Sequence, residues 1–155
     1  MAIRSGDRAT VFQLPAGPGE WVDLSEYMGR ERVVLLFFPL AFSSVCTTEL
    51  CTVTREWGGW EDLDARVFGI SVDSPFVTKR FRESEGIGFP ILSDFNRKVS
   101  RAYGVLHEDL LGLEGVAKRS AFVIDRNGMV VYDWVSDDPG VEPDYEAIRR
   151  ALEDA

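Results

Sequence analysis

The sequence predicts an α/β fold with a central mixed β-sheet flanked by helices on both faces. Two apolar runs, 32–38 and 65–73, alternate with segments of helical periodicity. An Asn-Gly pair at 127–128 joins two further strand-like runs, and the chain ends in an amphipathic segment at 143–153. Strand–helix repeats give parallel pairing and a hairpin gives antiparallel pairing, so the sheet is mixed. We expect the 155 residues, 1–155, to form a single domain.

We expect a loop-rich segment before the first buried strand. Residues 6–30 contain several prolines and glycines, and short alternating pieces around 10–14 and 21–24 predict a small hairpin. The run RVVLLFF at 32–38 is apolar enough to be buried on both faces of a sheet. Pro39 then ends this strand.

A helix is expected to follow from Ser43 or Ser44, where a hydroxyl can cap the first turn. The pair at 58–59, two glycines, weakens its far end. Apolar residues recur at helical spacing at Leu50, Val53, Trp57 and Trp60.

The rest of the chain divides into six predicted elements and one loop. In order, these are a strand at 65–73, a helix at 74–85, a short strand at 89–92, a short helix at 96–104, a loop at 104–118, a hairpin of 119–125 with 129–135, and a helix at 143–153.

The net charge of the chain restricts the classes of partner that we expect it to bind. Lysine and arginine number 17 against 26 acidic residues, which gives a formal net charge of −9. This charge disfavours binding to nucleic acid or to an anionic membrane, so small molecules or proteins are expected as partners. No apolar run approaches the roughly 18 residues of a membrane span, and the first residues lack the apolar core of a signal peptide. We therefore expect a cytosolic protein.

Both cysteines lie in the stretch PLAFSSVCTTELC, residues 39–51. The predicted strand-loop-helix order places Cys46 in the first turn of the helix. Unpaired backbone N–H groups and the positive end of the helix dipole favour an anion there, and the thiolate is the reactive form of cysteine. Position alone therefore gives Cys46 a reason to be reactive.

Cys51 follows five residues later. Five steps of an intact α-helix correspond to a rotation of about 500° and a rise of about 7.5 Å, which separates the two Cα atoms by roughly 8.7 Å. A disulfide needs Cα atoms within about 7 Å of each other. Bonding of Cys46 to Cys51 therefore requires the first helical turns to unwind.

The two cysteines allow several interpretations. They can be small buried hydrophobes that only pack. A closed zinc site wants four ligands, whereas the chain offers two cysteines and one histidine, His107. A thioredoxin-type site would have two intervening residues rather than four. His107 lies beside Glu108 and Asp109 in the predicted loop, and we expect it to be solvated rather than to act as a catalytic base.

The spacing of Pro39, Ser43 and Cys46 resembles the Pro-x-x-x-Thr/Ser-x-x-Cys signature of the peroxiredoxins, thiol peroxidases with a thioredoxin-like fold. Further segments that resemble the family follow in matching order over nearly the whole chain: the buried strand before the motif, GISVDSP, FPILSDF, AYGV, and Arg119 opening SAFVIDRNG. The motif region most resembles the alkyl hydroperoxide reductase E type. The second cysteine also resembles the bacterioferritin comigratory protein type.

The resemblance implies a role for each motif residue. Cys46 would attack the peroxide and become a sulfenic acid, and Pro39 would shape the loop and shield the thiolate. Ser43 would hydrogen-bond the peroxide; threonine is commoner there, and serine lacks the methyl group that restricts the rotamer. Arg119 would stabilise the thiolate and the developing oxyanion. Glu49 would orient Arg119 through a charge-assisted hydrogen bond.

The sequence allows two fates for the oxidised Cys46. Cys51 can resolve the sulfenic acid as an intramolecular disulfide, or an external thiol can do so while Cys51 merely packs. The resemblance implies a hydroperoxide substrate, no metal, haem or flavin, and a thioredoxin- or glutaredoxin-like reductant. Members of the family often pair, so both a homodimer and a monomer are compatible with the resemblance. The alternatives are a thiol/disulfide oxidoreductase and a non-catalytic redox sensor or holdase that uses the same cysteine.

Overall fold

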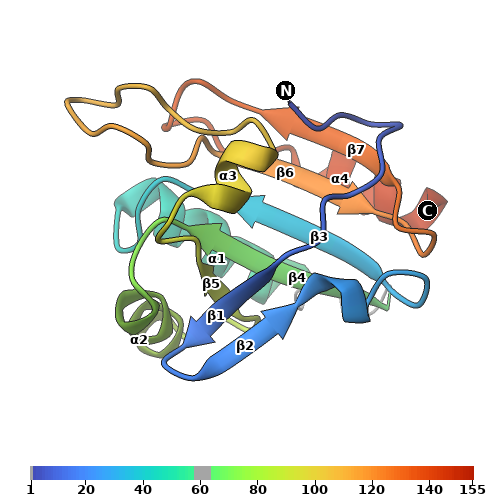
Figure 1. The fold of residues 1–155 in the computed structure, drawn as a ribbon, viewed down its shortest axis with the longest axis horizontal. Helices are drawn as coiled ribbons and strands as arrows, with labels where there is room; N and C mark the ends of the chain where they lie inside the picture. The colour runs from blue at the N-terminus through green and yellow to red at the C-terminus, as the bar shows by residue number, and fades with distance from the viewer. Residues whose placement is uncertain (1, 58–63) are drawn as a thin grey trace.

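A computed structural model describes residues 2–57 and 64–155. Its centre is a five-stranded sheet in the order β5-β4-β3-β6-β7 (Figure 1). The strands are β3 (Arg32–Phe37), β4 (Ala65–Ser71), β5 (Ile91–Ser93), β6 (Ser120–Ile124) and β7 (Val130–Val135). The β3, β4 and β5 strands run parallel, whereas β6 pairs antiparallel with β3 and with β7. The sheet is therefore mixed, as predicted.

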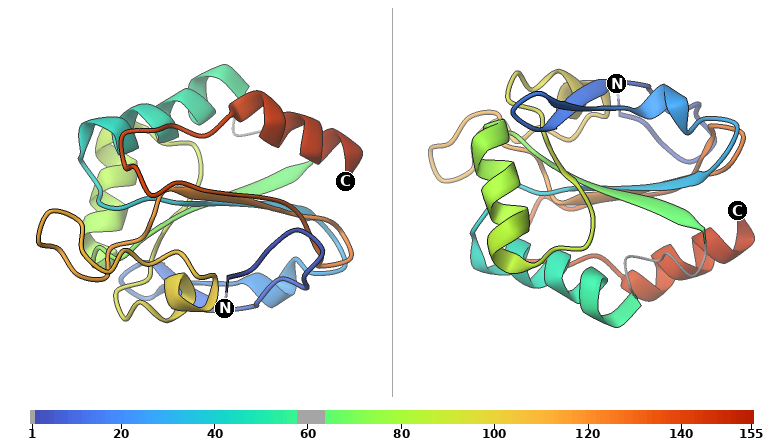
Figure 2. Two further views of the ribbon diagram at one scale, coloured as in Figure 1. Left: turned by 90° about the horizontal axis from the view of Figure 1, so that it is seen from above. Right: turned by 90° about the horizontal axis from the view of Figure 1, so that it is seen from below.

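Helices and the N-terminal hairpin cover the two faces of the sheet. The helices are α1 (Ser44–Trp57), α2 (Pro75–Glu85), α3 (Lys98–Ala102) and α4 (Tyr145–Asp154). Figure 2 shows α1 and α4 on one face and α3 with the hairpin on the other, while α2 lies at the β5 end of the sheet. No helix among the described residues is long and apolar enough to cross a membrane.

Each face of the sheet has its own apolar core, and β3 contributes to both. Val34 and Leu36 point into the core under α1 and α4, whereas Val33, Leu35 and Phe37 point into the core under the hairpin. Side chains alternate across a strand, so a strand that is apolar at every position is buried on both sides. This explains why 32–38 reads as one unbroken apolar run.

The N-terminal hairpin differs from the prediction by three residues. It consists of β1 (Gln13–Gly17) and β2 (Glu20–Asp23), followed by a 3-10 turn at Leu24–Glu26, whereas the sequence pattern favoured a first strand at 10–14. The connection is only two residues, and Gly19 within it has a φ of +75°. A turn this short fixes the register, so the strands must begin next to it. Residues 10–12 are left beyond the last pair of the hairpin.

The other elements lie close to their predicted positions. The α2 helix begins after Ser74, whose side chain accepts from the N–H of Val77, and it ends at Gly86, which has a φ of +63°. The α4 helix begins two residues later than predicted because Asp144 caps it. The predicted contribution of Trp60 and of the glycines at 58–59 lies outside the described residues.

The strand directions bring several loops to one edge of the sheet. The parallel strands β3, β4 and β5 all end at the left of Figure 1, and β6 starts there because it runs the opposite way. The connection from β3 to α1 therefore meets the segments that follow β4 and precede β6. Crevices outside the carboxyl ends of strands are common ligand sites in α/β sheets.

Candidate active site

The β3–α1 connection places Cys46 as the third residue of α1, with 0% of its surface exposed. Phe42 in this connection has a φ of +67°, a left-handed conformation that turns the chain into the helix. Its ring packs against Phe81 of α2 at 5.0 Å between centroids. Pro39 lies two residues after the end of β3 and is buried. The sulfur is thus held where a strand gives way to a helix.

Asp73 fastens the β3–α1 connection to the end of β4. Its Oδ2 atom accepts a hydrogen bond from the N–H of Ala41 at 2.8 Å and one from Ser71 Oγ at 2.7 Å. Sequence reasoning assigned no role to Asp73. The sequence did contain an indication, because a carboxylate two residues after a buried strand is well placed to bind backbone amides of a neighbouring loop.

Arg119 connects two acceptors that lie far away in the sequence. Its Nη2 atom lies 3.1 Å from Cys46 Sγ, and its Nη1 atom donates to Glu49 Oε1 at 2.6 Å. The side chains of Arg119 and Glu49 are 1% and 0% exposed. A guanidinium presents several donors in one plane, so it can hold a sulfur and a carboxylate together. The structure thus brings together three of the predicted site residues.

A backbone carbonyl completes the surroundings of Arg119. The carbonyl oxygen of Pro139 accepts from Nε at 3.1 Å and from Nη2 at 2.9 Å. The N–H of Ser136 donates to the carbonyl oxygen of Arg119 at 2.9 Å, so the β7–α4 connection holds both the backbone and the side chain. Sequence reasoning missed this contact because a backbone acceptor leaves no side-chain signature.

Burial has the largest effect on the pKa of Glu49. It raises the pKa of Glu49 to about 7, against the lowering effect of Arg119, and the charge of Glu142 adds to the rise. The second oxygen, Oε2, has no hydrogen-bond partner among the described residues. Burial also raises the pKa of Tyr145, which donates to Glu142 Oε1 at 2.5 Å and feels the charges of Glu49 and Arg119. The start of α4 therefore belongs to the electrostatic surroundings of the site.

Ser43 lies immediately before α1. Its hydroxyl donates to the carbonyl oxygen of Leu40 at 2.9 Å, and its own carbonyl accepts from the N–H of Thr47 at 2.9 Å. Among the described contacts, neither Ser43 nor Ser44 offers a hydroxyl oxygen to a helix amide. The predicted hydroxyl cap is therefore wrong: the tight connection turns the Ser43 side chain back toward the loop.

The first turn of α1 consequently keeps free donors. The N–H groups of Ser44, Val45 and Cys46 have no acceptor within the described part of the chain. The first amides of a helix have no partner within the helix itself. They form the positive end of the helix dipole, which favours negative charge close to Cys46.

A family model described as AhpC/TSA family matches residues 5–133. The chain belongs to this family of peroxiredoxins. The alkyl hydroperoxide reductase E of Mycobacterium bovis is 38% identical over 130 residues, covering 83% of this chain and 82% of that protein. A crystal structure of the peroxidoxin BcpB from Mycobacterium tuberculosis matches with a TM-score of 0.81 at 32% identity, covering 97% of this chain and 95% of that one.

The comparisons also confirm the predicted fold. A crystal structure of AhpC from Enterococcus faecalis matches with a TM-score of 0.83 at 27% identity, covering 99% of this chain and 92% of that one. The resemblance stated from the motif is therefore confirmed, and so is the enzyme class. The chain is a peroxiredoxin with the thioredoxin-like fold of that family, and a thiol-dependent hydroperoxide reductase.

Cys51 of this peroxiredoxin lies in the same unbroken helix as Cys46, and both thiols are free. It is half-buried, and its Sγ atom lies 3.8 Å from the carbonyl oxygen of Glu85 as a weak donor. Burial raises the pKa of the Cys51 thiol, the charge of Glu85 adds to this, and Arg55 opposes it. The two sulfurs therefore differ in their surroundings: within the described residues, a cation is hydrogen-bonded to Cys46 but not to Cys51.

His107 is buried, with 7% of its surface exposed, so the prediction of a solvated side chain is wrong. The loop that carries it is folded onto itself, and His107 exchanges backbone hydrogen bonds with Val116 and Gly115. Burial lowers the pKa of His107, assisted by Lys118. The peroxiredoxin has no group of three potential metal-ligating side chains close together within the residues that the structure describes.

Proposed function

We propose that this peroxiredoxin reduces hydrogen peroxide and organic hydroperoxides through the thiolate of Cys46, and that Cys51 resolves the oxidised product. The observation that carries the proposal is the 3.1 Å contact between Arg119 Nη2 and Cys46 Sγ. A buried cation hydrogen-bonded to sulfur favours the anionic form that attacks peroxides. Burial alone would lower the pKa of Arg119, but Glu49 and Cys46 hold it above its ordinary value, so the guanidinium stays charged.

The first step is a displacement at oxygen. The Cys46 thiolate attacks one oxygen of the peroxide, an S–O bond forms and the O–O bond breaks. The product is a sulfenic acid, and the departing alkoxide or hydroxide takes a proton to become an alcohol or water. Negative charge grows on the departing oxygen, so fixed donors around it lower the barrier.

Three groups are proposed to supply those donors. The Nη2 atom of Arg119 already lies beside the sulfur, and the N–H groups of the first turn, including that of Val45, are free within the described chain. The hydroxyl of Ser43 would exchange its bond to the Leu40 carbonyl for one to the peroxide. Because Arg119 and the helix amides are held in place before the substrate arrives, they need little reorganisation during the reaction.

The second step forms the disulfide. The Cys51 thiol condenses with the sulfenic acid, an S–S bond forms, and water leaves. The two residues are five positions apart in α1, so the first turns of the helix must unwind before the sulfurs meet. A dithiol protein of the thioredoxin or glutaredoxin kind would then reduce the disulfide by thiol exchange.

Peroxidase kinetics and peptide mass spectrometry test the proposal. Turnover of peroxide with excess dithiol should vanish in Cys46→Ser. In Cys51→Ser, the sulfenic acid should persist or overoxidise after one equivalent of peroxide, whereas the unmodified chain should give a peptide cross-linked between the two cysteines. A stable sulfenic acid at Cys46 with a free Cys51 in the unmodified chain would instead establish the one-cysteine mechanism.

We also propose that two copies pair through the loops at the carboxyl ends of β3, β4 and β5, the end of the sheet at which Cys46 lies. Large apolar side chains are exposed on the segments after β3, β4 and β5 and before β6. They are Phe42, Phe76, Phe95, Leu111 and Leu113. Contiguous exposed apolar surface is typical of protein interfaces. Light scattering should give twice the chain mass, and a Phe76→Asp variant should run as a monomer.

A further inference from the structure

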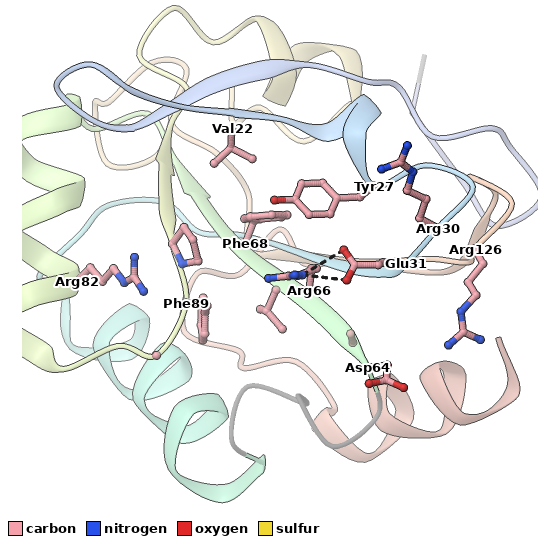
Figure 3. Close-up of a pocket in the computed structure, with 14 residues that line it drawn as sticks. Val22, Tyr27, Arg30, Glu31, Asp64, Arg66, Phe68, Arg82, Phe89 and Arg126 are labelled. Carbon is pink, nitrogen blue, oxygen red and sulfur yellow. Dashed lines mark hydrogen bonds and ion pairs between the residues drawn. The ribbon is translucent and has the colours of Figure 1, made fainter.

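A second candidate site lies at the opposite edge of the sheet from Cys46. A pocket of about 660 Å³ is bordered by the start of β4, by the connection that leads into β3, and by the connection from α2 to β5 (Figure 3). Its volume is within the range of roughly 300–1,000 Å³ that is usual for small-molecule sites. The peroxidase mechanism uses none of the residues that line it.

The pocket concentrates positive charge in an acidic protein. The chain as a whole carries a formal net charge of −9. Four arginines and two carboxylates line the pocket, which leaves two positive charges in excess. These residues are Arg30, Arg66, Arg82 and Arg126, with Glu31 and Asp64. A local cationic pocket on an anionic surface selects a small anion that fits inside it over an extended polyanion, which the remaining surface repels.

Two of the arginines are held by the protein itself. The Nε atom of Arg66 donates to both carboxylate oxygens of Glu31, at 3.2 and 3.1 Å, and the guanidinium carbon lies 5.7 Å from the centre of the Tyr27 ring. The Nε atom of Arg82 donates to the carbonyl oxygen of Ile87 at 3.3 Å. These contacts fix the walls of the pocket before any ligand arrives.

The other two arginines of the pocket, Arg30 and Arg126, are not held by comparable contacts within the described residues. Among the described residues, the guanidinium groups of Arg30 and Arg126 make no hydrogen bond or ion pair, and both side chains are exposed. Figure 3 shows Arg30 and Arg126 at the end of the pocket where Glu31 lies, and Arg82 at the other end. The planar donor array of a guanidinium matches the oxygens of a phosphate group. This end of the pocket can therefore bind a phosphate without breaking an existing contact.

The middle of the pocket is aromatic. The rings of Tyr27 and Phe68 lie 5.5 Å apart and tilted by 60°, and Phe89 lines the wall beside them. Figure 3 shows these side chains between Arg82 and the Arg30 end. A flat ring can pack against such a surface, which inorganic phosphate cannot exploit.

We propose that this pocket binds an organic phosphate that carries a planar ring, the chemistry of a nucleotide. The phosphate groups bind Arg30 and Arg126, and the ring packs against the exposed part of Tyr27, which the buried ring of Phe68 supports from below. The site is distinct from the peroxide site, since it lies at the amino ends of β3 and β4, whereas Cys46 follows the carboxyl end of β3.

Isothermal titration calorimetry on the reduced full chain at low ionic strength tests the proposal, with ATP and inorganic tripolyphosphate as probes. ATP should bind with one site per chain, and more tightly than tripolyphosphate because only ATP carries a ring. The double variant Arg30→Gln/Arg126→Gln should bind ATP about tenfold or more weakly, since two charged hydrogen-bond donors are removed.

Arg80→Gln is a control for the loss of an exposed arginine outside the pocket. Arg80 is an exposed arginine of α2 that does not line the pocket, so its replacement changes the net charge while leaving the site intact. ATP affinity should be unchanged in this variant. The proposal is overturned if ATP does not bind the unmodified chain, or if the double variant binds ATP as tightly as Arg80→Gln does. Equal affinities for ATP and tripolyphosphate would refute a ring ligand.

Discussion

The guanidinium of Arg119 joins Cys46 to Glu49, with Nη2 3.1 Å from the sulfur and Nη1 2.6 Å from a carboxylate oxygen. One cation thus holds a sulfur and a carboxyl group together inside a fully buried site. The Pro139 carbonyl accepts from the same guanidinium, so the side chain cannot turn away without losing several hydrogen bonds. Fixing donors in advance is the main way in which a protein stabilises charge that develops during a reaction.

Replacement of Arg119 should slow the attack on peroxide far more than it alters the fold. We expect Arg119→Gln to lower the second-order rate constant with hydrogen peroxide by on the order of 100-fold to 1,000-fold, the usual loss when a transition-state donor is removed. Arg119→Lys should recover only part of this, because an ammonium cannot bridge two acceptors in one plane. Stopped-flow fluorescence of the reduced chain measures the rate.

Arg80→Gln is the matched control for this experiment as well, because it removes an arginine that is exposed. Its rate constant should equal that of the unmodified chain. A rate for Arg119→Gln within a few-fold of this control would mean that Arg119 serves the structure rather than the reaction.

Ser43 should contribute less than Arg119. We expect Ser43→Ala to lower the same rate constant by about threefold to tenfold, the value of one neutral hydrogen bond. Ser43→Thr should retain or raise the rate, since threonine keeps the hydroxyl and restricts its rotamer. Identical rates for Ser43→Ala and the unmodified chain would show that the hydroxyl stays bonded to Leu40 during the reaction.

The sequence was sufficient to predict the sheet and the order of elements around it. Unbroken apolar runs marked strands buried on both faces, and Val33 and Val34 indeed face opposite cores. The hairpin was misplaced by three residues because its register depends on a two-residue turn rather than on the alternation that precedes it. The alternation of apolar and polar residues therefore predicts that a strand is present, whereas the geometry of the turn decides at which residues the strand begins and ends.

The site was predictable only where side-chain spacing carried the information. The motif from Pro39 to Cys46 is local, and a resemblance to known sequences was needed to connect it with Arg119. The Pro139 carbonyl and the buried position of His107 depend on how distant loops fold back. No pattern of residues along the chain encodes such contacts, because they arise from tertiary packing.

The buried carboxyl of Glu49 should make stability depend on pH. Its pKa is raised from an ordinary value of 4.5 to about 7 in the folded chain. The folded state therefore binds the proton more tightly than the unfolded state, and this stabilisation is fully present below about pH 4.5 and lost as the pH rises through about 7. The loss should amount to about 3 kcal/mol in the free energy of unfolding.

Urea unfolding at pH 4.5 and at pH 8 checks this expectation. Other groups titrate over the same range, so the informative quantity is the difference between the unmodified chain and Glu49→Gln. The amide keeps an oxygen that can accept from Arg119 but has no charge to desolvate. The variant should therefore lack the roughly 3 kcal/mol decline, and an equal decline in both proteins would contradict the assignment to Glu49.

The link between α1 and the segment after α2 should control how fast the disulfide forms. The hydroxyl of Thr54 accepts from the N–H of Gly88 at 3.0 Å, and Cys51 contacts the carbonyl of Glu85 nearby. Both contacts hold α1 in the folded form, in which Cys46 and Cys51 cannot meet. Thr54→Val preserves the shape of the side chain but removes both the acceptor for Gly88 and the hydroxyl that donates to the carbonyl oxygen of Leu50 at 2.9 Å, so local unwinding should become easier.

We expect disulfide formation after oxidation of Cys46 to be about threefold to tenfold faster in Thr54→Val, since two hydrogen bonds that hold this part of α1 are lost. The initial attack on peroxide should be unchanged, because Thr54 lies two helical turns beyond Cys46. Quench-flow followed by alkylation and mass spectrometry separates the two steps. If Thr54→Val leaves the second step as slow as in the unmodified chain, then unwinding of this part of α1 does not limit resolution, and opening of the first turn alone must set the rate.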